Sequence, residues 1–212
     1  MSENLNQQYS VKEEKLNIIS HGLGLVLSAV AFPFLLQKSF DFDGFWQLVS
    51  FILYGLSMLI LYAASTFYHA AKNPKKRRKL NILDHAAIYV LIAGSYSPFC
   101  LVGLSASLGW YMFLLVWLFA LIGIVLKLFF TGRFSKTSTA MYLLMGWQVL
   151  FFIKPLKENI TASGFQFLIA GGVFYSIGAI LYSIKKMPYN HAIFHVFVLL
   201  GSLSHFLAIY NL

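Results

Sequence analysis

The stretch from Trp110 to Phe130, WYMFLLVWLFALIGIVLKLFF, decides the fold class. Its only charged residue is Lys127. A helix of roughly 20 predominantly apolar residues is long enough to cross a bilayer. It also satisfies its own backbone hydrogen bonds, as lipid requires. This stretch therefore predicts a transmembrane helix.

The rest of the chain is also rich in apolar residues and poor in charged ones. Of its 212 residues, 59% are hydrophobic and 11% are charged. Soluble domains average roughly 45–50% apolar residues and about 25% charged residues. Its 21 Phe and 12 Tyr exclude a disordered chain. The single cysteine, Cys100, excludes a disulfide framework and a CxxC motif. We expect a multi-pass protein of the cell membrane, in which any metal site uses histidines and carboxylates.

Seven apolar runs of sufficient length predict an all-α, seven-transmembrane helix bundle. They are Leu16–Leu36, Phe45–Ala70, Ile82–Val102, Trp110–Phe130, Thr137–Ile153, Gly164–Ile184 and His191–Tyr210. We expect one transmembrane domain over residues 16–212, preceded by a cytoplasmic segment, 1–15. The first run has no signal-peptide cleavage site, so it is expected to be retained.

Lysine and arginine predict the orientation, because basic residues near span ends stay on the cytoplasmic side. Three of them, Lys38, Lys154 and Lys157, fall on one side of the predicted bundle. The twelve on the other side are Lys12, Lys15, Lys72, Lys75, Lys76, Arg77, Arg78, Lys79, Arg133, Lys136, Lys185 and Lys186. This asymmetry predicts a cytoplasmic amino terminus and an outside carboxyl terminus.

Two basic features need separate interpretations. The loop 72–79 lies between two predicted spans, so we expect it to contact anionic lipid headgroups and not nucleic acid. Lys127 lies near the predicted cytoplasmic end of its span, and we expect its ammonium group to snorkel to the headgroups.

Ionisable residues inside a membrane span cost about +2.5–3.5 kcal/mol each at its centre and therefore need an explanation. His69, Asp84, His191 and His195 all fall at span ends on the predicted cytoplasmic side. His191 and His195 are four residues apart, so their side chains project from one helix face. Ser65 and His69 have the same spacing, which places a hydroxyl one turn from a third imidazole.

Three neutral imidazoles with an open fourth position are typical of a catalytic zinc site, although they also suit copper, iron and nickel. Asp84, the carboxylate at the edge of this layer, is suited to orient a metal-activated water and shuttle its proton. The alternative is that the histidines are interfacial packing residues. His205 lies about 15 Å beyond His195 along a helix and cannot share the ion, and spacing does not place His21 or His85.

Four motifs together resemble the hemolysin III family, the bacterial branch of the progestin and adipoQ receptor superfamily. They are Glu14-x-x-Asn17-x-x-Ser20-His21-Gly22, Ser65-Thr66-Phe67-Tyr68-His69, Asp84-His85 and His191-Ala192-Ile193-Phe194-His195. The resemblance covers nearly the whole chain. It implies zinc held by His69, His191 and His195, with Asp84 holding a water and Ser65 in support. The likeness to alkaline ceramidases in the wider superfamily implies hydrolysis of a lipid amide.

Three classes of function follow. The first is a zinc-dependent hydrolase, or a regulator descended from one, acting on membrane acyl lipids. The second is a membrane-homeostasis receptor in which zinc is structural. The third is a cytolytic, hemolysin-like protein, which uniformly apolar spans disfavour because a secreted toxin needs a soluble form. The sequence leaves protein partners, the substrate and the oligomeric state open.

Overall fold

The structure is a computed structural model that describes residues 9–131, 135–184 and 186–212. All regular secondary structure within these ranges is helical. The elements are α1 (Val11–Ser39), α2 (Phe45–Ala70), α3 (Pro74–Leu101), α4 (Ala106–Phe130), α5 (Ser135–Gly146), the 3₁₀ helix η1 (Trp147–Phe152), α6 (Ile153–Asn159), α7 (Ala162–Ser183) and α8 (Asn190–Tyr210).

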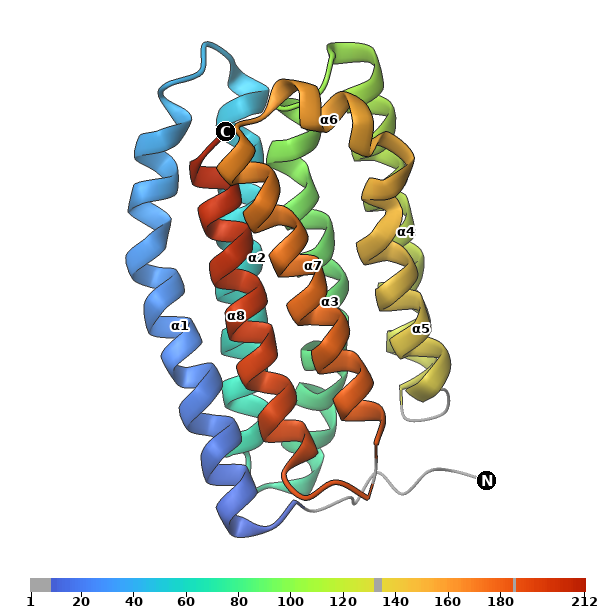
Figure 1. Ribbon diagram of the computed structural model, residues 1–212. Helices are drawn as coiled ribbons and strands as arrows, with labels where there is room; N and C mark the ends of the chain where they lie inside the picture. Colours follow the sequence, from blue (N-terminus) through green and yellow to red (C-terminus); the bar gives the residue numbers. More distant parts are fainter. Residues whose placement is uncertain (1–8, 132–134, 185) are drawn as a thin grey trace.

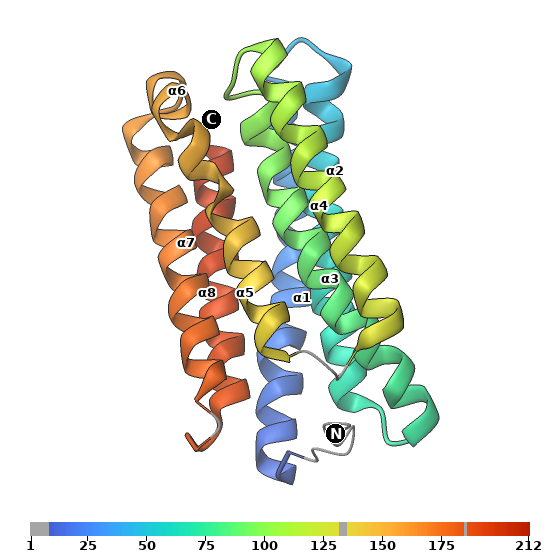
Figure 2. The ribbon, with the colours of Figure 1, turned by 90° about the vertical axis from the view of Figure 1, so that its right-hand side faces the viewer.

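The long helices stand side by side in one up-and-down bundle (Figures 1 and 2). Neighbours in sequence pack together, as in α2–α3, α3–α4 and α7–α8, and the first helix, α1, also packs against the last, α8. The starts of α1, α3 and α8 meet the ends of α2, α4 and α7 at the lower end of Figure 1, which we call the basic end. Lys12, Lys15, Lys72 and the cluster 75–79 lie there, whereas Arg133 and Lys185 lie outside the described residues.

The surface of the bundle is apolar, as a lipid-facing surface must be. Along α4, for example, Leu114, Leu118 and Leu121 are more than half exposed. Six helical stretches among the described residues are long and apolar enough to cross a membrane: α1, α2, α4, residues 137–159, α7 and α8. The prediction of a polytopic helical bundle is therefore confirmed.

Two helices begin earlier than the sequence indicated. Helix α3 starts at Pro74, so most of the expected loop 72–79 is helical and that loop prediction is wrong. The reason is the cap, because the Asn73 side chain accepts from the Lys76 backbone amide at 3.1 Å and Pro74 suits the first helical turn. Helix α1 likewise starts at Val11, within the expected segment 1–15, and the Ser10 hydroxyl accepts from the Glu13 amide.

The fifth apolar run is interrupted where one continuous helix was predicted. Tyr96 of α3 inserts its hydroxyl into this run, donating to the Gly146 carbonyl at 2.6 Å and accepting from the Val149 amide at 2.9 Å. These bonds occupy the backbone groups that would continue the helical ladder. The run consequently passes from α5 through η1 to α6, with a local break of the kind that an inserted side chain produces.

Helices α2 and α3 approach closely at Gly94. A Cβ atom there would lie 2.3 Å from the Ser57 hydroxyl and 3.1 Å from the Leu53 carbonyl oxygen. Glycine lets the two backbones meet, as small residues do at helix contacts in membranes. At Gly146, on α5, a Cβ atom would meet nothing within 4 Å. The α2–α3 pair is therefore tightly packed, and the surroundings of Gly146 are open.

Candidate metal centre

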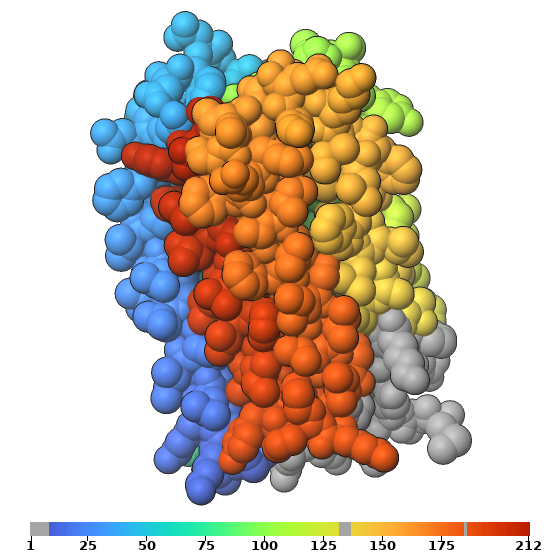
Figure 3. Space-filling view, viewed as in Figure 1, coloured from blue at the N-terminus to red at the C-terminus, as the bar shows by residue number. Residues whose placement is uncertain are grey.

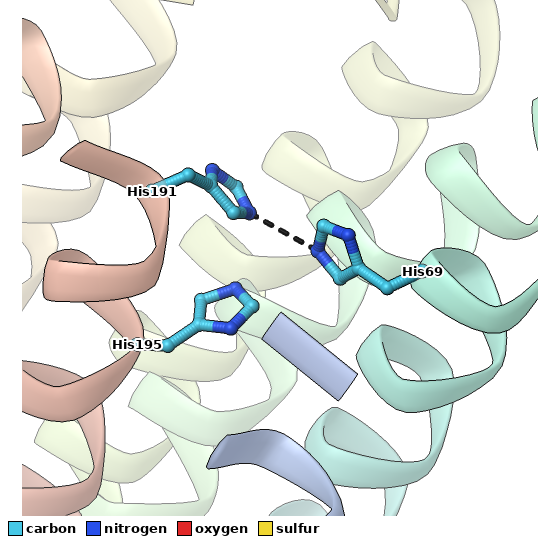
Figure 4. Close-up of side chains that lie close together, drawn as sticks. All are labelled: His69, His191 and His195. Carbon is cyan, nitrogen blue, oxygen red and sulfur yellow. Dashed lines mark hydrogen bonds between the residues drawn. The ribbon is translucent and has the colours of Figure 1, made fainter. Parts of the chain in front are cut away.

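Three buried histidines converge at the basic end (Figure 4). His69 comes from the last turn of α2, and His191 and His195 come from the first two turns of α8. Each offers one ring nitrogen, and these three atoms lie within 4.8 Å of one another. The Nε2 atoms of His69 and His191 are 3.1 Å apart. The structure thus brings together the three histidines that the sequence singled out.

The entry into α8 positions its two histidines. The Asn190 side-chain amide donates to the Tyr182 carbonyl at 2.9 Å and to the Ile184 carbonyl at 3.3 Å, which ties α8 to the end of α7. The preceding residue, Tyr189, has a left-handed backbone with φ of 57°, a conformation costly for a residue with a Cβ atom. A strained but anchored turn therefore fixes where α8 starts.

Helix α1 holds His69 through a carboxylate. Glu14 Oε2 lies 2.7 Å from His69 Nδ1, and the other carboxylate oxygen pairs with Arg77 of α3. Arg77 also donates to three carbonyls at the end of α2, including that of His69. With Nδ1–H directed at Glu14, the Nε2 lone pair of His69 faces the cluster, the arrangement in which carboxylates orient metal-binding histidines.

His195 is oriented in the same way by a hydroxyl of α1. Ser20 Oγ donates to the Asn17 carbonyl at 3.1 Å, so its lone pairs are left to accept from His195 Nδ1 at 3.3 Å. The proton of His195 then resides on Nδ1, and Nε2 is free as an inward-facing ligand.

Tyr9, just before α1, supports the third ring. Its hydroxyl lies 3.1 Å from His191 Nδ1, and burial raises the pKa of this phenol well above its usual range. The phenol therefore stays protonated and can either donate to His191 or accept from it.

His21 adds a fourth imidazole without joining the three. Its ring stacks on that of His195, with centroids 3.5 Å apart and planes 12° apart. Its two ring nitrogens have no hydrogen-bond partner among the described residues. His21 therefore packs the inner wall of the cluster, which spacing along the chain did not reveal.

The donor set fits zinc. Two Zn–N bonds of 2.0–2.1 Å at a tetrahedral angle place their nitrogens about 3.3 Å apart, close to the 3.1 Å between the Nε2 atoms of His69 and His191. With Nδ1 of His69 directed at Glu14 and Nδ1 of His195 at Ser20, Nε2 of each ring is turned inward, and it is neutral imidazole that binds a metal. Three nitrogens leave one tetrahedral position for another ligand.

The histidines open onto an internal cavity of about 160 Å³. His191, His195 and Asp84 line it near the basic end, and His205 lines it further along α8. Asp84 is buried, and its Oδ2 atom lies 3.8 Å from His85 Nδ1. Ser65 is fully buried one turn before His69, and its hydroxyl has no hydrogen-bond partner in the described part of the chain.

The sequence alone assigned no role to the residues that contact the rings: Tyr9, Glu14, Ser20 and Asn17, whose side-chain nitrogen lies 3.4 Å from His69 Nδ1. A signal was available for three of them, because positions 14, 17 and 20 recur every three residues along one face of α1. That periodicity indicates a polar inner face on the first turns of α1. For Tyr9, which precedes the helix, no local pattern indicates the contact.

Fold and site together define a multi-pass membrane protein of helical bundle type, with a buried histidine centre at one end of the bundle. The family model described as "Haemolysin-III related" matches residues 9–206, and the chain belongs to this family. This confirms the resemblance carried by the motifs and places the protein in the cell membrane.

Curated relatives match along almost the whole chain. Hemolysin-3 of Bacillus cereus is 46% identical over 199 residues, which cover 94% of this chain and 91% of the relative. The hemolysin-3 homolog of Bacillus subtilis (strain 168) is 45% identical over 201 residues, which cover 95% of this chain and 94% of the relative. The monocyte to macrophage differentiation factor of Homo sapiens is 26% identical over 205 residues, which cover 94% of this chain and 84% of the relative.

Proposed function

We propose that this chain is a zinc-dependent hydrolase of membrane acyl lipids, with His69, His191 and His195 as the metal ligands. The observation that carries the proposal is the set of outer partners, because Glu14 and Ser20 hold two rings with their Nε2 lone pairs turned inward. A histidine that merely packs needs no such arrangement. The cavity beside the rings supplies space for a substrate.

Zinc held here would polarise a substrate carbonyl and lower the pKa of a water towards roughly 7. The Asp84 carboxylate is placed in the same cavity to accept a proton from the attacking water and return it to the leaving group. We assign a supporting role to Ser65, which is fully buried one turn before His69 on α2. The apolar cavity wall excludes water and suits an acyl chain, so we propose a lipid amide, as in ceramidases, as the substrate type.

The same proposal includes the topology. We count α3 as a span in addition to the six apolar stretches, which gives seven spans, and the excess of lysine and arginine at the basic end supports a cytoplasmic position for that end. The amino terminus is then cytoplasmic and the carboxyl terminus outside. The substrate would accordingly enter from the inner leaflet.

A regulator with structural zinc is the second candidate, and the cavity argues against it because structural zinc sites are closed. The name of the Bacillus cereus relative describes lysis of blood cells. For this chain we propose residence in its own membrane, since large apolar side chains are exposed along the lipid-facing helices.

The test uses detergent-purified protein and the Asp84→Asn variant, both assayed for zinc per chain and for fatty acid released from a membrane lipid extract. We expect one zinc in each protein, and turnover about 10²–10⁴-fold lower in the variant. Chelation should abolish turnover in the wild type. Zinc retained without any turnover in the wild type would favour structural zinc, and absence of zinc would refute the proposed centre.

A further inference from the structure

Lys127 is buried, contrary to the expectation that it snorkels to the headgroups. Its side chain is 6% exposed. It belongs to the inward face of α4, which consists of Gly109, Met112, Val116, Ala120, Gly123 and Lys127. Because successive members of this stripe are three or four residues apart, they share one helix face. The ammonium group therefore points into the bundle and not towards the lipid.

No carboxylate neutralises this cation within the described residues. Lys127 Nζ donates to Ser138 Oγ of α5 at 2.6 Å and lies 5.8 Å from the centre of the Tyr142 ring. The ion pairs found in that part of the chain involve other cations. An ammonium group has three donors, and a charge in an apolar interior is costly without an opposite charge.

Lys127 lines the same cavity as the histidine centre. The cavity wall near it carries the hydroxyls of Ser138 and Thr139, and Tyr142 links it to α3 by donating to the His85 carbonyl at 2.9 Å. Much of the remaining wall is apolar, including Ile88, Leu91, Ile92, Leu143, Phe194 and Val198. Helices α5 and α7, which contribute to this wall, lie side by side on the face shown in Figure 3. A buried cation in an apolar chamber matches an amphiphile with a negatively charged head.

We propose that Lys127, with the hydroxyl of Ser138, binds the anionic phosphate headgroup of an acyl lipid whose chain occupies the cavity. This inference rests on the proposed function and deepens it, because it makes the substrate an anionic acyl lipid and not a neutral one. The bond to be cleaved then lies between the headgroup held at Lys127 and the chain beside the histidines.

The test compares two probes with the same acyl chain, lysophosphatidic acid and monoacylglycerol. Their dissociation constants are measured by native mass spectrometry with purified wild type, Lys127→Met and Lys127→Arg. Lys157→Met serves as the matched control, because Lys157 is an exposed cation on α6 at the opposite end. Charge-assisted hydrogen bonds contribute enough that we expect the wild type to prefer the phosphate lipid by tenfold or more.

The preference should fall to within twofold in Lys127→Met, persist in Lys127→Arg and remain unchanged in Lys157→Met. Equal binding of both probes by the wild type, or an undiminished preference in Lys127→Met, would overturn the inference. Displacement of the lipid by millimolar inorganic phosphate alone would also overturn it, because the site would then take a free anion.

The binding measurement needs neither metal nor turnover. A failure of headgroup binding at Lys127 can therefore be distinguished from a failure of the proposed hydrolase. Repeating it with His195→Ala shows whether headgroup binding persists without the centre, as we expect. Hydrolysis of neutral lipids without any anionic preference would leave the proposed hydrolase standing and remove only the role of Lys127. Should Lys127→Met not fold, Ser138→Ala is the substitute, with an expected severalfold loss of the preference.

Discussion

The two sides of the histidine cluster are built differently. On one side, which we call the packed side, α1 and α2 meet and Tyr9, Glu14 and Ser20 bind the outer edges of the rings. On the other, the open side, α3, α4, α5 and α7 surround the cavity with Asp84 and Lys127 in its wall. The packed side fixes ring geometry, and the open side leaves polar groups available to a ligand. In the proposed hydrolase, ring positioning and reaction would therefore fall to different helices.

The largest expected effect is a difference in zinc content between variants of two α8 histidines, both of which line the cavity. His195 is held by Ser20 at the packed side, whereas His205 lies further along, edge-on to Tyr175 at 5.3 Å. His195→Ala should lose zinc completely, and His205→Ala should keep one zinc per chain. Elemental analysis of the purified proteins measures this. Equal zinc content in the two variants would erase the distinction between ligand and packing histidines.

A second prediction concerns the packed side alone. Glu14→Gln removes the charge that orients His69 but keeps the shape of the side chain, so zinc affinity should fall by about 10–100-fold. Competition with a chromophoric chelator measures the affinity. Glu158→Gln, on exposed α6 at the opposite end, is the matched control and should behave as the wild type. Unchanged affinity in Glu14→Gln would show that the 2.7 Å contact is not a positioning contact.

The smallest effect tests the packing difference itself. Gly94→Ala forces a Cβ atom to 2.3 Å from Ser57 Oγ and should lower the free energy of unfolding by about 1–3 kcal/mol. At Gly146 the backbone is helical and an added Cβ atom would meet nothing within 4 Å, so Gly146→Ala should be neutral or stabilising by up to about 1 kcal/mol. Denaturation followed by circular dichroism in detergent compares them. Similar losses of unfolding free energy in both variants would contradict the conclusion that Gly94 is tightly packed and that the surroundings of Gly146 are open.

The sequence predicted the elements whose ends coincide with a change of composition. The run Phe45–Ala70 matches α2 residue for residue, and the last run differs from α8 by one residue at its start. Hydropathy did not predict the start of α3, which the Asn73 cap determines, or the interruption of the fifth run by the Tyr96 hydroxyl. Hydropathy reports transfer into lipid, and these boundaries depend on single hydrogen bonds.

The candidate site was predicted in part for a similar reason. Spacing of four residues shows that His191 and His195 share a helix face, but not which helix that face meets. The contacts of Glu14 and Ser20 depend on α1 packing against α2 and α8, and that information is tertiary. The prediction for Lys127 was wrong because its closeness to the span end suggested exposure, whereas it continues the buried stripe of α4.

His69 and His191 lie 122 positions apart in the chain. Synthesis runs from the amino terminus, so a nascent chain displays Glu14, Arg77 and His69 long before α8 exists. Such a precursor offers one of the three candidate ligands, which is too few to retain an ion. The histidine centre is therefore the last part of the molecule to be assembled, and it exists only in copies that have been translated and inserted through α8.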